Sequence, residues 1–107
     1  MKERSWEEIL KKAMETWGYT QQALVACEEM GELAQTLSKW SRQGDYADFK
    51  KVKMMRNNIA AEIADVSIML TQFSLFFGIE DDELEERIDG KLSMIAEKLF
   101  PEDYEDL

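Results

Sequence analysis

Four acidic residues are candidates for a chemical role, because helical spacing would put them in or beside an apolar surface. Glu29 and Glu32 are three residues apart, and Glu62 and Asp65 repeat this spacing further along the chain. At about 100° per residue, Glu29 falls inside the apolar arc of its helix, which is formed by Val25, Ala26, Leu33 and Trp40. Glu62 falls inside a second arc, formed by Ile59, Val66, Met69, Phe73 and Phe76.

The neighbouring acids lie further from the centre of each arc. Glu32 is about 60° from Glu29 and Asp65 about 60° from Glu62, which places both at the edge of the apolar face. Glu28 is about 100° from Glu29, outside the arc. Other acid pairs, Asp82 with Glu85 and Glu83 with Glu86, lie off the apolar face of their segment and are typical of solvated charge.

An ionised carboxylate within an apolar surface is unfavourable unless something neutralises it. Pairing with lysine or arginine is one solution, but Lys39 is the only lysine in the segment that holds Glu29 and lies two turns beyond Glu32. A bound cation is the other solution. Oxygen ligands alone suit Mg²⁺ or Mn²⁺, whereas zinc prefers nitrogen and sulfur. The pattern favours Mg²⁺, with Mn²⁺ as a possible substitute.

Composition excludes several other kinds of chemistry. The chain has no histidine and one cysteine, Cys27. This rules out a disulfide within the chain, Cys/His zinc sites, Ser-His and Cys-His catalysis, and a di-metal oxidase with Glu-x-x-His ligands. Thirteen basic and 23 acidic residues give a net charge of −10, which argues against binding to a nucleic-acid polymer or to an anionic membrane surface.

Length and composition predict a single all-α domain over residues 1–107. Apolar residues make up 45% of the chain, and there are 5 glycines and one proline. Helix signals predict segments over about 6–16, from Thr20 to the turn at Gly44, from Tyr46 to Phe77, and from the acids at 80–83 to Pro101. Ser5 with Glu8 would cap the first segment, Gly18 and Gly78 would end the first and third, and residues 102–107 would form a loose acidic tail.

The chain is expected to be soluble and cytoplasmic. Its amino-terminal residues are charged where a signal peptide would be apolar, and no stretch is expected to approach the roughly 18 apolar residues that span a bilayer. Apolar faces on the second and third segments exceed what two further helices can cover in so short a chain. We therefore expect a homodimer or a homotetramer.

The two acidic segments together resemble a known family. The motif Glu28-Glu29-Met30-Gly31-Glu32-Leu33, followed by Glu62-Ile63-Ala64-Asp65-Val66, is similar to the EExxE and ExxD motifs of the MazG-like all-α nucleoside triphosphate pyrophosphohydrolases. The resemblance covers about residues 20–100. It implies a four-helix bundle of the all-α NTP pyrophosphatase type, assembled as a dimer or a dimer of dimers with active sites near the subunit contacts.

The resemblance also implies an activity, the Mg²⁺-dependent cleavage of a nucleoside triphosphate to a monophosphate and pyrophosphate, in nucleotide-pool house-cleaning. It assigns the metal ligands to Glu29, Glu32, Glu62 and Asp65, the residues that helical geometry selects independently. A carboxylate that is not fully engaged with metal, Glu28 or Glu32, would accept the proton of the attacking water, and the sequence leaves this choice open.

Substrate contacts are less sharply indicated. Lys91, flanked by Arg87 and Lys98, could meet the phosphates, with Lys53 and Arg56 as alternatives. Asn58 precedes Glu62 by one turn, and Trp17 and Trp40 could stack on a base or serve as core or interface anchors. A different class of function also fits the composition, namely a non-catalytic acidic helical protein whose carboxylates meet a basic partner.

Overall fold

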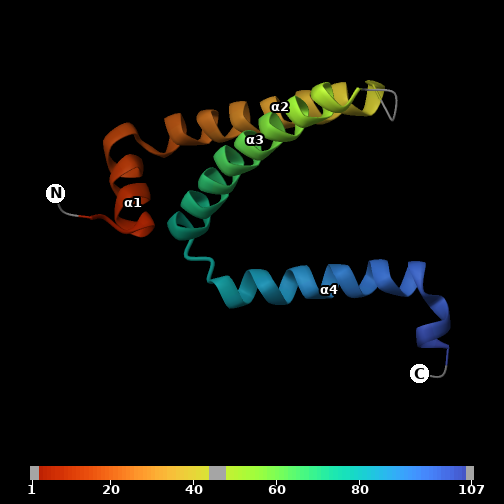
Figure 1. Ribbon diagram of the computed structural model, residues 1–107. Helices are drawn as coiled ribbons and strands as arrows, with labels where there is room; N and C mark the ends of the chain where they lie inside the picture. The colour runs from red at the N-terminus through yellow and green to blue at the C-terminus, as the bar shows by residue number, and fades with distance from the viewer. Residues whose placement is uncertain (1–2, 44–47, 106–107) are drawn as a thin grey trace. The chain divides into compact units, whose positions relative to one another are not determined.

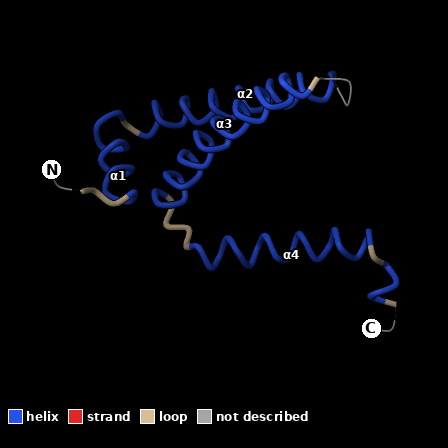
Figure 2. Tube along the Cα trace, in the orientation of Figure 1, coloured by secondary structure: helices blue, strands red, loops and turns tan. Residues whose placement is uncertain are grey.

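The described residues, 3–43 and 48–105 of the computed structural model, form α-helices and one short 3-10 helix, with no strand among them. The helices are α1 (Trp6–Trp17), α2 (Tyr19–Gln43), α3 (Phe49–Phe76) and α4 (Asp81–Leu99), followed by η2 (Pro101–Tyr104) (Figures 1 and 2). The all-α prediction is confirmed. The chain divides into two compact units, Met1–Phe76 and Phe77–Leu107.

Local signals explain most helix ends. The Ser5 hydroxyl accepts a hydrogen bond from the Glu8 backbone N–H at 3.1 Å, which satisfies one of the free donors at the start of α1. Gly18 (φ +84°) and Gly78 (φ +67°) have backbone conformations that residues with a Cβ rarely adopt, and they follow α1 and α3 as predicted.

Three predicted boundaries need correction. Thr20 is not a cap, because α2 begins one residue earlier, at Tyr19. The third helix, α3, begins at Phe49. The Asp48 Oδ1 atom accepts a hydrogen bond from the Lys51 N–H at 2.9 Å at this end of the helix. The predicted turn at Gly44 and the predicted start at Tyr46 lie outside the described residues. The tail is not entirely loose, because residues 101–104 continue as η2.

In the first unit, α2 and α3 form a long antiparallel pair and α1 packs against both (Figure 1). At one end, the rings of Tyr19 and Phe76 stack with their centroids 5.8 Å apart. Further along, the Thr36 hydroxyl on α2 reaches Glu62 on α3. These two contacts set the register of the pair and bring the two acidic segments to the same level.

The first unit buries few side chains. Leu10, Ala26 and Val66 are the buried apolar residues of the described chain, together with the polar residues Gln22 and Gln72. Large apolar side chains of α3 are exposed, including Ile63 (49%) and Leu70 (57%). A single copy therefore leaves much of the predicted apolar surface uncovered.

In the second unit, α4 contacts η2, and none of the described residues of these two helices is buried. α4 ends at Leu99, two residues before Pro101, as the proline predicts. Packing of the fourth helix against the other three, which a four-helix bundle within one chain requires, stays a prediction.

Helix α3 corrects one expectation about membranes. By length and composition it could cross a bilayer, because an 18-residue window reaches a mean hydropathy of 1.4 with 11% of the window buried. The expectation that no stretch approaches this length is therefore wrong. Core helices of soluble proteins pass the same test, so the cytoplasmic location stays a prediction.

Candidate functional site

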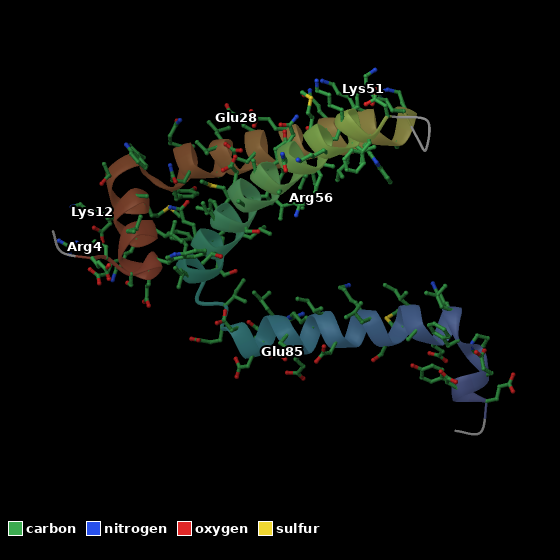
Figure 3. The ribbon with its side chains drawn as sticks, viewed as in Figure 1. Arg4, Lys12, Glu28, Lys51, Arg56 and Glu85 are labelled. Atoms are coloured by element: carbon green, nitrogen blue, oxygen red, sulfur yellow. The ribbon has the colours of Figure 1, made fainter. Side chains whose placement is uncertain are left out.

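The structure places Glu29 and Glu62 on facing helices, partly buried between them. Both side chains are intermediate in exposure, whereas Glu28, Glu32 and Asp65 are exposed. This order agrees with the helical wheel, which puts the first two inside the apolar arcs and the others at or beyond their edges. In Figure 3, Glu28 projects from the outer edge of α2.

Each of these two glutamates has one shielded oxygen atom without a partner. The Oε2 atoms of Glu29 and Glu62 are both shielded from solvent and accept no hydrogen bond from any residue that the structure describes. The other oxygen of Glu62, Oε1, accepts a hydrogen bond from the Thr36 hydroxyl at 2.8 Å. A buried carboxylate oxygen without a donor is unfavourable, so the two atoms mark a place where a positive group would bind well.

Glu29 is the carboxylate whose protonation is most clearly perturbed. Desolvation raises its pKa above the ordinary 4.5, and the negative charges of Glu32 and Asp65 raise it further. A side-chain hydrogen bond with Asp65 and the charge of Glu28 act in the same direction. Because Asp65 lies on α3, these effects show that Glu29 faces the acidic segment of the partner helix.

The four predicted ligands therefore gather on one stretch of the α2–α3 contact. Glu32 lies one turn from Glu29 and one turn from Thr36, on the same side of α2. With Thr36 bonded to Glu62, and Glu29 interacting with Asp65, both halves of the acidic motif meet across the two helices.

The present side-chain positions do not form a finished metal site. Within residues 3–43 and 48–105, no three Asp, Glu or Cys side chains converge closely enough to hold an ion. Like charges repel one another, so convergence of these carboxylates is unfavourable without a cation between them. The donor set and the two unpartnered oxygens fit a hard divalent ion, whereas the rotamers would have to change to bind it.

Of the predicted substrate contacts, Asn58 lies nearest to the acidic cluster along the chain. It is exposed on α3, one turn before Glu62. Lys91 is exposed on α4, in the second unit, so its role stays a prediction.

The two tryptophans proposed for stacking are far apart. Trp17 ends α1, and Trp40 lies near the far end of α2. At a rise of 1.5 Å per residue, the 21 steps along α2 from Tyr19 to Trp40 span about 30 Å. Both side chains are at least half exposed. Within one chain they therefore cannot hold the same base.

Sequence reasoning missed Thr36, which donates to Glu62. Spacing places Thr36 on the same face of α2 as Glu29, seven residues and two turns away, but it does not identify Glu62 on α3 as the partner of Thr36. It also missed Gln72, a buried polar residue at the same seven-residue spacing from Asp65 on α3.

The raised pKa of Glu29 predicts how stability depends on pH. A folded state that keeps its proton to higher pH than the unfolded state loses stability as the pH rises above 4.5 and through the raised pKa. With EDTA present, we therefore expect Glu29→Gln to raise the melting temperature at about pH 7.5 and to leave it nearly unchanged at about pH 3.5. The exposed variant Glu28→Gln is the matched control. An equal gain at both pH values would show that the charge of Glu29 is not responsible.

Comparisons of the chain with protein-family models, with curated proteins and with solved structures found no match.

Proposed function

We propose that the protein is a Mg²⁺-dependent nucleoside triphosphate pyrophosphohydrolase that cleaves (d)NTP to (d)NMP and pyrophosphate in the nucleotide pool of the cytoplasm. The observation that carries the proposal is the pair of buried, unpartnered oxygens of Glu29 and Glu62, one on each of two packed helices. The motif resemblance and the choice of ligands by helical geometry support the same function.

Glu29, Glu32, Glu62 and Asp65 would hold the metal, with Mn²⁺ as a substitute for Mg²⁺. When bound, a divalent cation supplies charge neutralisation at phosphate oxygens and lowers the pKa of a coordinated water. Thr36 positions Glu62 by donating to its Oε1 atom, which leaves Oε2 available to a ligand. Positioning Glu62 in this way accounts for a threonine on the face of α2 that carries Glu29 and Glu32.

Glu28 and Glu32 are the candidates for proton acceptance from the attacking water. Both are exposed, so each can reach a solvent molecule and return the proton to bulk water. Lys91, Asn58, Trp17 and Trp40 remain the proposed substrate contacts, with the two tryptophans serving different positions.

The experiment that tests the activity is a screen of ribo- and deoxyribonucleoside triphosphates with detection of pyrophosphate. We expect Mg²⁺-dependent release of pyrophosphate from at least one substrate and no release in EDTA. Release of orthophosphate alone, or no turnover with any triphosphate, would contradict the proposal.

The competing function is a non-catalytic helical protein that binds a basic partner. The net charge of −10 favours it, as does the small number of ion pairs in the described chain, Arg4 with Glu8 and Arg87 with Glu83. Thermal melting with millimolar Mg²⁺ separates the two functions, because a ligand bound only by the folded state raises its stability. We expect a clear rise in melting temperature with Mg²⁺ and none with an equal ionic strength of Na⁺.

We also propose that the protein assembles as a homodimer or homotetramer. The exposed apolar residues of α3, such as Ile63 and Leu70, support a further layer of packing on this helix. Light scattering at micromolar concentration should give a mass two or four times the 12.5 kDa of one chain. A monomer mass would contradict this prediction.

A further inference from the structure

Two cationic residues of the α2–α3 pair lie within two turns of the acidic residues, among the parts of both helices that the structure describes. Lys39 follows Glu32 on α2 by seven residues, a rise of about 10 Å. Arg56 precedes Glu62 on α3 by six residues, a rise of about 9 Å. Carboxylates repel phosphates, so a nucleotide that binds at the acidic residues needs a positive group nearby. Lys39 and Arg56 are the two candidates on this pair.

Rotation about the helix axes places Lys39 on one defined edge of the pair. Glu29 and Glu62 lie partly buried between the helices and mark the line along which α2 and α3 face each other. Two antiparallel helices share an edge at positions that are rotated from this line in the same sense, each about its own axis. On α2, Glu32 is about −60° and Lys39 about −80° from Glu29.

On α3, Asp65 and Arg56 fall on opposite edges. Asp65 is about −60° from Glu62, the same sense of rotation as that of Lys39 on α2. Arg56 is about +120° from Glu62. Lys39 therefore shares an edge with the exposed carboxylate of Asp65, and Arg56 lies on the other edge.

Asn58 lies opposite Lys39 on this edge. The Thr36 hydroxyl donates to the Glu62 Oε1 atom at 2.8 Å, which puts these two residues at one level of the pair. Lys39 follows Thr36 by three residues and Asn58 precedes Glu62 by four, which is about one turn in the same direction along two antiparallel helices. Asn58 is about −40° from Glu62, and both Asn58 and Lys39 are exposed. An ammonium from α2 and an amide from α3 thus lie at one level of the edge.

The other end of the same edge is occupied by α1. Gln72 follows Asp65 by two turns and is about −80° from Glu62. Its Nε2 atom donates a hydrogen bond to the Leu10 carbonyl oxygen of α1 at 3.0 Å. A row of phosphates that begins at the acidic residues therefore meets α1 in one direction and the exposed Lys39 in the other.

Lys39 is available to an anion. The ion pairs within residues 3–43 and 48–105 join Arg4 to Glu8 and Arg87 to Glu83, so Lys39 has no carboxylate partner in this part of the chain. No acidic residue lies three or four positions from Lys39 in the sequence, which is the spacing at which ion pairs form along a helix.

We propose that Lys39 binds the β and γ phosphates of a nucleoside triphosphate whose α phosphate lies at the acidic residues, and that Asn58 donates to the same phosphates. The proposal deepens the proposed function and rests on it for the cleavage. There, water attacks the α phosphorus and gives its proton to Glu28 or Glu32, while the bond from this phosphorus to the α–β bridging oxygen breaks and the oxygen leaves with pyrophosphate. Negative charge grows on this leaving group, and the ammonium of Lys39 stabilises it.

The test measures the binding of inorganic pyrophosphate in the presence of Mg²⁺ by isothermal titration calorimetry. We expect Lys39→Gln to weaken this binding by about tenfold, because it removes one charge-assisted contact. Lys39→Arg should keep most of the affinity, because it keeps the charge. The Mg²⁺-induced rise in melting temperature should not decrease in Lys39→Gln, because an ammonium is not a metal ligand.

Arg42→Gln is the matched control. It removes the same charge from the same helix, three residues from Lys39. The Arg42 Nη1 atom donates to the Ser38 hydroxyl at 2.7 Å, and Ser38 is about 180° from Glu29, on the side of α2 away from α3. We therefore expect Arg42→Gln to change the affinity for pyrophosphate by less than about twofold.

Three results would overturn the proposal: no binding of pyrophosphate by the wild type, equal losses in Lys39→Gln and Arg42→Gln, or a larger loss in Arg56→Gln than in Lys39→Gln. Equal losses would show attraction of anions without a defined site, and the third result would place the phosphates on the opposite edge.

Hydrolysis of triphosphates is measured separately, so that the two proposals can fail independently. Turnover with the same KM and the same pyrophosphate affinity in the wild type and in Lys39→Gln would refute the role of Lys39 and leave the proposed function intact. Binding of pyrophosphate that depends on Lys39, without hydrolysis of any triphosphate, would refute only the proposed function.

Discussion

Glu62→Gln is expected to lower Mg²⁺-dependent pyrophosphate release by roughly 100-fold or more, because it removes a charged oxygen ligand from the proposed metal site. The fold should survive. The neutral amide still offers an oxygen to the Thr36 hydroxyl, which now bonds to Glu62 Oε1 at 2.8 Å, and it carries no charge that must be desolvated. We therefore expect an equal or higher melting temperature in EDTA, and loss of the Mg²⁺-induced rise.

Two further variants make this result specific. Thr36→Val removes only the hydrogen bond to Glu62, so the concentration of Mg²⁺ needed for half-maximal activity should rise by about 10-fold to 100-fold while activity at saturating Mg²⁺ is kept. Glu97→Gln changes an exposed glutamate of α4 and should alter neither quantity. A Glu62→Gln protein that hydrolyses substrate at the wild-type rate would remove Glu62 from the metal site.

The helices could be predicted because their signals are local. Ser5 caps α1 through a residue three positions away, and Gly18 and Gly78 supply backbone conformations that end helices. The errors also have local causes. Thr20 has the side chain of a cap, but α2 already begins at Tyr19, directly after the non-helical Gly18, so Thr20 lies inside the helix and has no boundary to cap. Pro101 ends α4 as predicted and then begins η2, because its fixed φ suits the first turn of a helix.

Only part of the candidate site, the helix faces that carry its carboxylates, could be predicted from the sequence. Helical periodicity shows which face carries Glu29 and Glu62, since it depends on one helix at a time. The partner of Glu62 depends on the register between α2 and α3, which no spacing along one helix reveals, so Thr36 was missed. Gln72 was missed for the same reason, because its importance comes from α1, through the carbonyl oxygen of Leu10.

The separation of Trp17 from Trp40 likewise depends on a feature that the two residue types do not report, namely the length of the continuous helix α2. Both are aromatic residues near helix ends, which made them equivalent as stacking candidates in the sequence. The structure shows that α2 is continuous from Tyr19 to Gln43, so the helix itself holds them apart.

Neighbouring glutamates of the first motif should differ sharply in their effects on activity. Glu29 is partly buried, with a shielded Oε2 atom and a raised pKa, whereas Glu28 is exposed at the edge of α2 (Figure 3). We expect Glu29→Ala to abolish conversion of a deoxynucleoside triphosphate, because it removes a metal ligand. Glu28→Ala should retain detectable turnover with the same products, with a loss of about 10²-fold to 10⁴-fold if Glu28 rather than Glu32 accepts the proton.

Phosphorus NMR of the products decides both the bond that is cut and the roles of the two glutamates. Cleavage between the α and β phosphates gives a monophosphate and pyrophosphate, so diphosphate with orthophosphate from the wild type would overturn the reaction class. An inactive Glu28→Ala protein beside an active Glu29→Ala protein would show that the buried oxygen of Glu29 does not bind the metal. If both variants are inactive but only Glu29→Ala loses the Mg²⁺-induced rise in melting temperature, Glu28 acts on the proton and Glu29 on the metal.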